Sequence, residues 1–387
     1  MRRLIFDAEH EIFRDSVHRF FEGQIAPRAA AWRDQGFVDP DAFRAAGAQG
    51  YLLTWADEVY GGAGLADFRY EQIIYEENIC HGEVGFYINL HSGLVAPYID
   101  QLGTPEQKRR FLPGCVRGDT ILAIAMTEPG SGSDLAGMKS RATDEGECWL
   151  LNGSKTYISN GQIANLILVA ARTHPVNRHG IGLFLVEPNM GGFRRGKRLK
   201  KMGLAAQDTS ELFFDNVRIP KSHVLGDPVE GFRYLSRFLA SERLIAAIGS
   251  MAAAQTAFNL SLEFVLQREA FGQPIGTFQN SRFVLAELRT QLDAAQTFID
   301  QCVLLLNARA LTPELAAQAK LLASDLECRA VDIGVQLHGG AGYMQEYRIC
   351  RMYTDARVSR IFAGSNEIMK EIIGRSLGLD DRKLKTR

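Results

Sequence analysis

Residues 121–134 read ILAIAMTEPGSGSD, and the character of the chain changes at this point. The apolar first half is typical of a short buried strand, whereas the second half is a loop with two glycines and several hydroxyl side chains. Backbone N–H groups and hydroxyls in such a loop can closely approach an electron-rich ring or a phosphate. A plain glycine turn has the same composition, so the loop alone does not establish a binding site.

Helical patterns precede this stretch. Asp7 can cap a helix whose apolar residues share one face, and Pro27 should interrupt that helix. Asp39–Pro40 and Thr104–Gln107 have the cap residues of two further helices. The first third of the chain is therefore expected to be helical.

Strand-like runs follow, and long helical patterns come after them. The strand-like runs cover residues 121–127, 166–172, 181–187 and 211–219. Within this section the Asn152–Gly153 pair favours a tight hairpin. The helical patterns cover residues 232–268, 278–309 and 313–338.

Helices, strands and helices in this order do not alternate as a doubly wound parallel sheet requires. The expected fold class is α+β with three domains. These are an N-terminal helical domain (1–120), a middle β domain (121–230) and a C-terminal helical domain (231–387).

The composition excludes several classes of protein. The 387 residues are 46% hydrophobic and include 44 basic and 45 acidic side chains, so no net field attracts a nucleic acid or an anionic membrane surface. No apolar run approaches the roughly 18 residues of a membrane span, and no apolar signal core follows the N-terminus. We expect a cytoplasmic protein, or a mitochondrial matrix protein if this is a mature eukaryotic chain. Cysteines and histidines lack metal-ligand spacing, so no metal site is expected.

Two segments match nucleotide-binding motifs only in part, so neither motif is assigned. Gly130–Leu135 begins like a dinucleotide fingerprint but has leucine where the third glycine belongs. Gly191–Lys197 fits the first seven positions of a phosphate-binding loop, but Arg198 replaces the serine or threonine that would hold magnesium.

Five separated motifs together resemble the acyl-CoA dehydrogenase family, in the family's order and over essentially the whole chain. They are residues 125–137, Tyr157–Gly161, Arg268–Gly272, Gln336–Asp355 and Ile361–Glu367. Similarity to the long-chain branch is greatest in Ile124–Gly130, Lys201–Leu204, Ala206–Thr209 and Asn366–Glu371. The resemblance implies a C-terminal four-helix bundle, with FAD bound between it and the β domain and partly across a subunit interface.

The resemblance also implies which residues hold FAD. The glycine loop contributes Ile124, Ala125, Met126, Thr127, Gly132 and Ser133, and the other side of the flavin ring is covered by Tyr157, Ile158 and Ser159. The pyrophosphate and adenosine positions are Arg268, Phe271 and Gln279. A neighbouring subunit contributes Gln336, Leu337, His338, Gly339 and Gly340, and a further turn contains Ser365, Asn366 and Glu367.

The catalytic base implied by the resemblance is Glu242. Most of the family has glutamate where this chain has Ala363, whereas the long-chain and isovaleryl branches supply it from the segment that Phe238–Ala246 matches. The alternative is an exposed helix carboxylate, but the apolar neighbours favour burial, which would raise the pKa of Glu242. Positions that contact the substrate match Ser133, Arg243, Ala363 and Gly364.

The implied reaction converts a saturated acyl-CoA to trans-2-enoyl-CoA and passes electrons from FAD to electron-transferring flavoprotein. The protein is expected to be a homo-oligomer, either a dimer or a tetramer. Gly93 and Pro97 could loosen a helix and deepen the acyl pocket for a long or branched chain, although small residues also serve close packing. Two alternatives stay open, namely an acyl-CoA oxidase that uses oxygen and a non-catalytic flavin-binding assembly protein.

Overall fold

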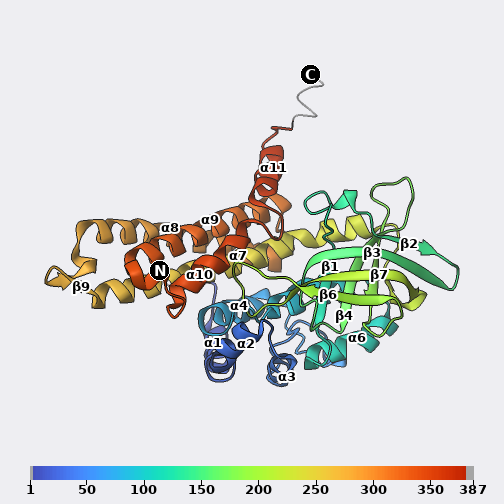
Figure 1. Cartoon of the computed structure of the whole chain (residues 1–387), viewed down its shortest axis with the longest axis horizontal. Helices are drawn as coiled ribbons and strands as arrows, with labels where there is room; N and C mark the ends of the chain where they lie inside the picture. Colours follow the sequence, from blue (N-terminus) through green and yellow to red (C-terminus); the bar gives the residue numbers. More distant parts are fainter. Residues whose placement is uncertain (1–2, 381–387) are drawn as a thin grey trace.

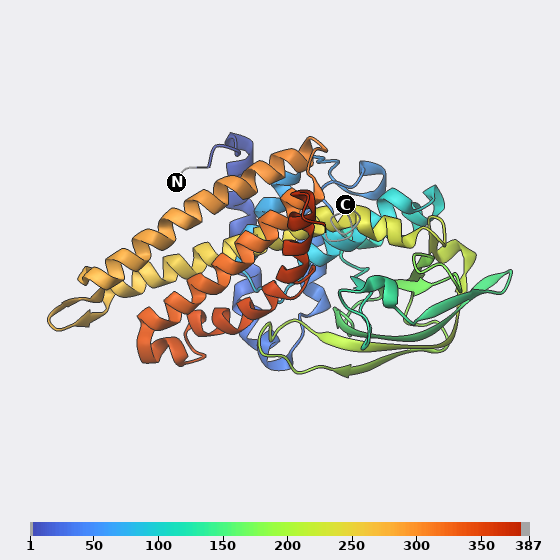
Figure 2. The ribbon, with the colours of Figure 1, turned by 90° about the horizontal axis from the view of Figure 1, so that it is seen from above.

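The computed structural model describes residues 3–380 and consists of helical, β and helical parts in chain order (Figure 1). Residues 381–387, expected as the end of the C-terminal domain, lie outside the described part. Two perpendicular views place the β sheet at one end of the molecule and the β9 turn at the other (Figures 1 and 2).

Six α-helices form the N-terminal part between residues 3 and 120. They are α1 (Ala8–Phe20), α2 (Ala29–Gln35), α3 (Pro40–Ala48), α4 (Phe68–His81), α5 (Ala96–Leu102) and α6 (Pro105–Arg117). Asp7 accepts the His10 N–H at the start of α1, and Thr104 forms a capping box with Gln107 at α6. A π-helical segment (Phe21–Ile25) and a 3-10 turn with Pro27 follow α1, so the expected interruption is confirmed.

The middle part is one mixed sheet. Its strands are β1 (Leu122–Ala125), β2 (Arg141–Asp144), β3 (Cys148–Ser159), β4 (Leu166–Arg172), β5 (Ile181–Val186), β6 (Phe193–Arg198), β7 (Thr209–Pro220) and β8 (Val224–Leu225). The order is β6-β7-β3-β2-β4-β5-β8, and β1 pairs with β4 in parallel. Leu166 and Leu168 of β4 pack into the core shared with the helices, whereas Ile167 and Val169 pack into a second core inside the β domain. Burial of both faces explains the uninterrupted apolar run of β4.

The hairpin expected at Asn152–Gly153 is wrong. Both residues lie inside β3, which pairs with β7 on either side of a register shift. Gly153 has a φ of +143°, and an added Cβ would lie 2.3 Å from Ser140 Oγ. The glycine therefore serves a bulge and a close approach, because pairing with β7 outweighs the local preference for a turn.

The C-terminal part is a bundle around one very long helix. Its helices are α7 (Gly231–Gln267), α8 (Gln279–Asn307), α9 (Pro313–His338), α10 (Arg348–Ala356) and α11 (Asn366–Ser376). The short strands β9 (Glu269–Ala270) and β10 (Gln273–Pro274) lie in the turn between α7 and α8. The three long helical patterns expected from the sequence are confirmed.

Helix α7 is the one helix within residues 3–380 that is long and apolar enough to cross a membrane by length and composition. In the structure, 67% of its apolar window is buried inside the protein. The N-terminal helix α4 packs on α7, as do α8 and α9. Since the central helix of a bundle has the same composition, these features are weak evidence for a membrane span.

Candidate active site

The glycine loop begins where β1 ends. Five of the residues expected to bind the cofactor are partly or fully exposed in this loop, namely Ile124, Met126, Thr127, Gly132 and Ser133. Side chains alternate along the strand, and that of Ala125 is fully buried in the β core. Only the backbone of Ala125 can therefore face a ligand. An added Cβ at Gly132 would meet no atom within 4 Å. The loop therefore presents open backbone to the surface.

A buried ion pair holds this loop against β3. Lys155 Nζ lies 2.8 Å from Glu128 Oε1 and donates to the Met126 carbonyl at 2.9 Å. The Glu128 carboxylate also accepts the backbone N–H groups of Lys139 and Ser140. Burial acts to raise the pKa of Glu128, but Lys155 and these N–H groups outweigh it, so the pKa is lowered. The loop and the strand that carries Tyr157 are thereby fixed relative to each other.

Tyr157 follows this pair on β3 and is 67% exposed. Its φ of +60° lies in the left-handed region, and β3 loses regular register with β7 between Lys155 and Ile158. An exposed aromatic in a strained conformation is typical of a ligand contact. Ile158, in contrast, is buried in the β core, so its side chain cannot cover a bound ring, and Ser159 is partly exposed.

Glu242 is on α7 and is 4% exposed. The Tyr98 hydroxyl, on α5, donates to Glu242 Oε1 at 2.9 Å. Burial raises the pKa of Glu242 to about 7, while the Tyr98 hydrogen bond and the Arg243 charge act to lower it. A carboxyl group with this pKa exchanges a proton readily at neutral pH, which suits a general base. The expected burial of Glu242 is confirmed.

Arg243 is also buried, and its Nε has no hydrogen-bond partner among residues 3–380. Burial lowers the pKa of Arg243, and the charge of Glu242 opposes this effect. An unpartnered guanidinium nitrogen in the interior costs free energy unless a ligand satisfies it. The substrate-binding role of Arg243 stays a prediction.

The turn that contains Ala363 lies close to α7, since Phe362 lines the same cavity as Ile245 and Ala246. Ala363 has a φ of +51°, and its N–H makes no hydrogen bond within the described part of the chain. Lys320 on α9 fixes this turn by donating to the Gly364 carbonyl at 2.8 Å. The resulting turn presents a free backbone N–H instead of a carboxyl group.

The next three residues expected to bind the cofactor lie at the start of α11. Ser365 caps the helix by accepting the Ile368 N–H, and Glu367 is exposed. Asn366 is buried and accepts from Lys320 at 2.8 Å. It also donates to Asp325 at 3.0 Å, so its side chain already has partners inside the chain.

The remaining expected cofactor residues lie at the far end of the bundle (Figures 1 and 2). Arg268 follows α7, Phe271 lies in the β9–β10 turn with a φ of +54° and 96% exposure, and Gln279 begins α8. Gln336, Leu337, His338, Gly339 and Gly340 end α9 and begin the next turn, and His338 stacks on Phe264 at 4.1 Å between ring centroids.

This placement bears on the expected division of the cofactor site between subunits, which stays a prediction. Only Gln336–Gly340 was expected from a neighbour, but Arg268 shares the same end of the bundle. Arg268 lies about 39 Å from Glu242 along α7 at the α-helical rise. Arg268 and the end of α9 therefore lie far from Glu242 along the axis of α7.

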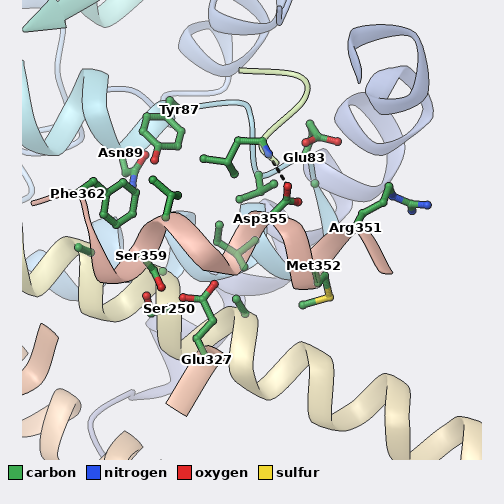
Figure 3. Close-up of a pocket in the computed structure, with 18 of the residues that line it drawn as sticks. Glu83, Tyr87, Asn89, Ser250, Glu327, Arg351, Met352, Asp355, Ser359 and Phe362 are labelled. Atoms are coloured by element: carbon green, nitrogen blue, oxygen red, sulfur yellow. Dashed lines mark hydrogen bonds between the residues drawn. The ribbon is translucent and has the colours of Figure 1, made fainter. Parts of the chain in front are cut away.

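A cavity of about 120 Å³ extends beyond Glu242 between α7, α10 and the segment that follows α4 (Figure 3). Ile245, Ala246 and Gly249 line it from α7, and Phe362 and Asn89 lie at one end. Gly93 does not line it. An added Cβ at Gly93 would lie 2.3 Å from Tyr75 Oη and 2.8 Å from Ile245 Cδ1, so this glycine serves close packing. Pro97 begins α5 after a π-helical segment, Leu90–Val95, which does loosen the helix there.

Sequence reasoning missed the residues that organise these parts, namely Tyr98, Lys155, Lys320 and Glu327. None stands in a pattern that marks it, because each acts on a segment distant in the sequence. One potential metal-ligating group within residues 3–380, His18, Glu77 and His81, was also not indicated by spacing. Glu77 already accepts Arg14 at 2.7 Å, so this group is part of an ion-pair network.

Family comparisons agree with this arrangement. Models of acyl-CoA dehydrogenase N-terminal, middle and C-terminal domains match residues 7–119, 123–217 and 229–378. The chain belongs to the acyl-CoA dehydrogenase family. It is thus an oxidoreductase of an FAD-dependent flavoprotein family, and the expected three-part fold is confirmed.

Individual proteins and solved structures of this family are similar to the chain over almost its whole length. The mitochondrial long-chain specific acyl-CoA dehydrogenase of Sus scrofa is 44% identical over 378 residues, which are 97% of this chain and 88% of that protein. The crystal structure of an acyl-CoA dehydrogenase from Geobacillus kaustophilus has a TM-score of 0.95 and 42% identity, covering 97% of this chain and all of that one. A glutaryl-CoA dehydrogenase from Mycobacterium smegmatis in complex with FADH2 has a TM-score of 0.90 and 27% identity, covering 96% and 95%. The expected similarity to the long-chain branch is confirmed.

Replacing Lys155 by Met should lower the free energy of unfolding by about 3–5 kcal/mol, because the buried Glu128 carboxylate loses its counter-charge. Urea unfolding followed by circular dichroism measures this loss. Arg109→Met is the control, since its pair with Glu106 is exposed and should be worth less than about 1 kcal/mol. Equal losses in the two variants would contradict the role given to the buried pair.

Replacing Tyr98 by Phe removes a hydrogen bond that lowers the pKa of Glu242, so this pKa should rise above about 7. Because a base must be ionised to act, the acid-side limb of kcat/KM should move to higher pH by about half to one unit. The pH profile measures the shift. Tyr353→Phe, at an exposed position on α10, should leave it unchanged. A shift to lower pH would contradict the contact.

Proposed function

We propose that this chain dehydrogenates a long or branched saturated acyl-CoA to trans-2-enoyl-CoA, with Glu242 as the base and electron-transferring flavoprotein as the acceptor. The observation that carries the proposal is the buried Glu242 carboxyl, which shares a face of α7 with the lining of a largely apolar cavity. Ala363 cannot take a proton, so Glu242 is the available base at this site.

Glu242 removes the α-proton of the thioester. The proton moves to a carboxylate whose pKa burial has raised to about 7, so the ionised base is present at neutral pH and is stronger than an exposed glutamate. The thioester oxygen gains negative charge as the proton leaves. The free N–H of Ala363 is suited to hold that oxygen, because a fixed donor stabilises charge that develops in the transition state.

The residues present fit FAD. Open backbone in the glycine loop, the fixed position of Thr127 next to β3 and the exposed ring of Tyr157 form a surface for a planar ring system. Arg268 and the exposed Phe271 are suited to a phosphate and an aromatic base, but they lie at the end of the C-terminal bundle that is far from Glu242. When bound, FAD supplies the hydride acceptor. Two copies of the chain are therefore required to complete one site, which supports a homo-oligomer.

The choice of a long or branched substrate rests on two observations. The chain is 44% identical to a long-chain specific enzyme, and its cavity continues along α7 for several turns beyond Glu242. A cytoplasmic location stays a prediction.

Glu242→Gln should slow anaerobic flavin bleaching by saturated acyl-CoA by roughly 10²- to 10⁴-fold, because the amide cannot take the α-proton. Stopped-flow absorbance with acyl-CoAs of graded length and branching measures the rates. Glu263→Gln, at an exposed glutamate on the same helix, is the control and should react at the wild-type rate. Equal rates for Glu242→Gln and wild type would overturn the base. Peroxide formation without reduction of electron-transferring flavoprotein would instead favour an oxidase.

Arg268→Ala should lower the flavin content of the purified protein several-fold, because a paired cationic contact to a phosphate is lost. The ratio of flavin to protein absorbance measures this content, and light scattering measures the oligomeric state. Arg44→Ala, at an exposed arginine on α3, is the control. Full flavin content in a monomeric protein would contradict a site shared between chains.

A further inference from the structure

The cavity beyond Glu242 contains a carboxyl group that the proposed chemistry does not use. Glu327 on α9 lines this cavity and is 8% exposed. Its Oε2 has no hydrogen-bond partner among residues 3–380, and it belongs to no ion pair there. Figure 3 shows the Glu327 carboxyl beside Ser250 and Ser359. An unsatisfied oxygen in this position is costly unless a ligand group or a water meets it.

The position of Glu327 relative to Glu242 follows from the geometry of α7. At 100° per residue, Glu242, Ala246, Gly249 and Ala253 lie on one face of this helix, and the last three line the cavity. Ser250, which lines the cavity beside Glu327, is about 12 Å beyond Glu242 along the helix axis. Carbon–carbon bonds of about 1.5 Å advance an extended chain by a little over 1 Å each, so about ten carbons bridge this interval.

Nearby cationic groups do not neutralise Glu327. Lys320 is engaged by the Gly364 carbonyl and by Asn366. Arg33 pairs with Glu83 at 2.6 Å, and Arg348 donates to two backbone carbonyls at 2.7 Å. The cavity wall has two further acids: Glu83 is paired with Arg33, and Asp355 accepts the Leu204 N–H. Among the described residues that line the cavity, Glu327 is the acid with a buried oxygen that has no hydrogen-bond partner.

The environment also favours a particular ligand chemistry. Burial raises the pKa of Glu327 to about 8, although the hydroxyls of Ser250 and Ser359 act to lower it. A carboxyl group that is largely protonated at neutral pH both donates and accepts hydrogen bonds. A hydroxyl group can do the same and matches either protonation state. A carboxylate on the ligand would meet like charge whenever Glu327 ionises, and an apolar chain would leave Oε2 without a partner.

We propose that Glu327 binds a hydroxyl group carried by the acyl chain about ten carbons from the α-carbon, so that the preferred substrates are hydroxylated long-chain acyl-CoAs. The inference rests on the proposed function, because it takes the cavity as the acyl site. Ile245 and Ala246 contact the hydrocarbon near the thioester, and Glu327 with Ser250 recognises the hydroxyl group.

The test compares saturated acyl-CoAs of equal length with and without a hydroxyl group between carbons 10 and 13. Wild type should bleach its flavin with a kcat/KM about 5- to 10-fold higher for the best hydroxylated chain, mainly through KM. In Glu327→Leu this ratio should fall to one or below, because the unsubstituted chain then meets an apolar wall. Glu327→Gln should retain most of the preference, since an amide also donates and accepts. Asp332→Asn, at an exposed acid on α9, should retain all of it.

The outcomes separate the two proposals. Absence of any preference in wild type, or retention of the full preference in Glu327→Leu, would overturn the role of Glu327 while leaving the proposed function intact. A water-filled site predicts the first of these results. If Glu327→Leu does not fold, as judged by its melting curve, Glu327→Ala takes its place and should likewise lose the preference. Failure of every acyl-CoA to bleach the flavin would overturn the proposed function and this inference with it.

Discussion

Burial of α7 is the constraint on which the rest of the structure depends. This helix has 37 residues and packs against helix α4 of the N-terminal part, strand β5 of the sheet and the other long helices of the bundle. A helix enclosed in this way needs apolar residues around most of its circumference, and its composition satisfies that need. Because α7 is continuous, it sets the positions of Glu242, the cavity and Arg268 along one axis.

Buried charge has two opposite uses in this protein. Glu128 is paired with Lys155, and its pKa is lowered, so it serves as a fixed anion that holds the glycine loop. Neither Glu242 nor Glu327 has a salt-bridge partner among residues 3–380, and burial raises their pKa values to about 7 and 8. The pKa of a buried glutamate in this protein thus depends on whether it forms an ion pair with a cation. Lys320 repeats the structural use at the turn that presents Ala363.

In the proposed function, a single chain does not complete the flavin site. Tyr157 and Phe271 are both exposed aromatics with positive φ, but Tyr157 is in the β sheet and Phe271 is in the β9–β10 turn at the far end of the C-terminal bundle. Strained and exposed residues of this kind gain stability when a ligand or a second chain covers them. Oligomerisation and cofactor binding are therefore coupled in the proposed function, and loss of one is expected to weaken the other.

The sequence by itself determined the order of the three parts, the caps at Asp7 and Thr104, the family and the candidate base, because these depend on local pattern or on motifs read along the chain. Only the tertiary structure decided that Asn152–Gly153 stays within a strand, that Lys155 supports the loop, and that Glu327 faces a cavity. Each of these outcomes depends on partners from distant segments. Burial and pairing set the free energy of a charge or a turn, and both arise only when those segments meet.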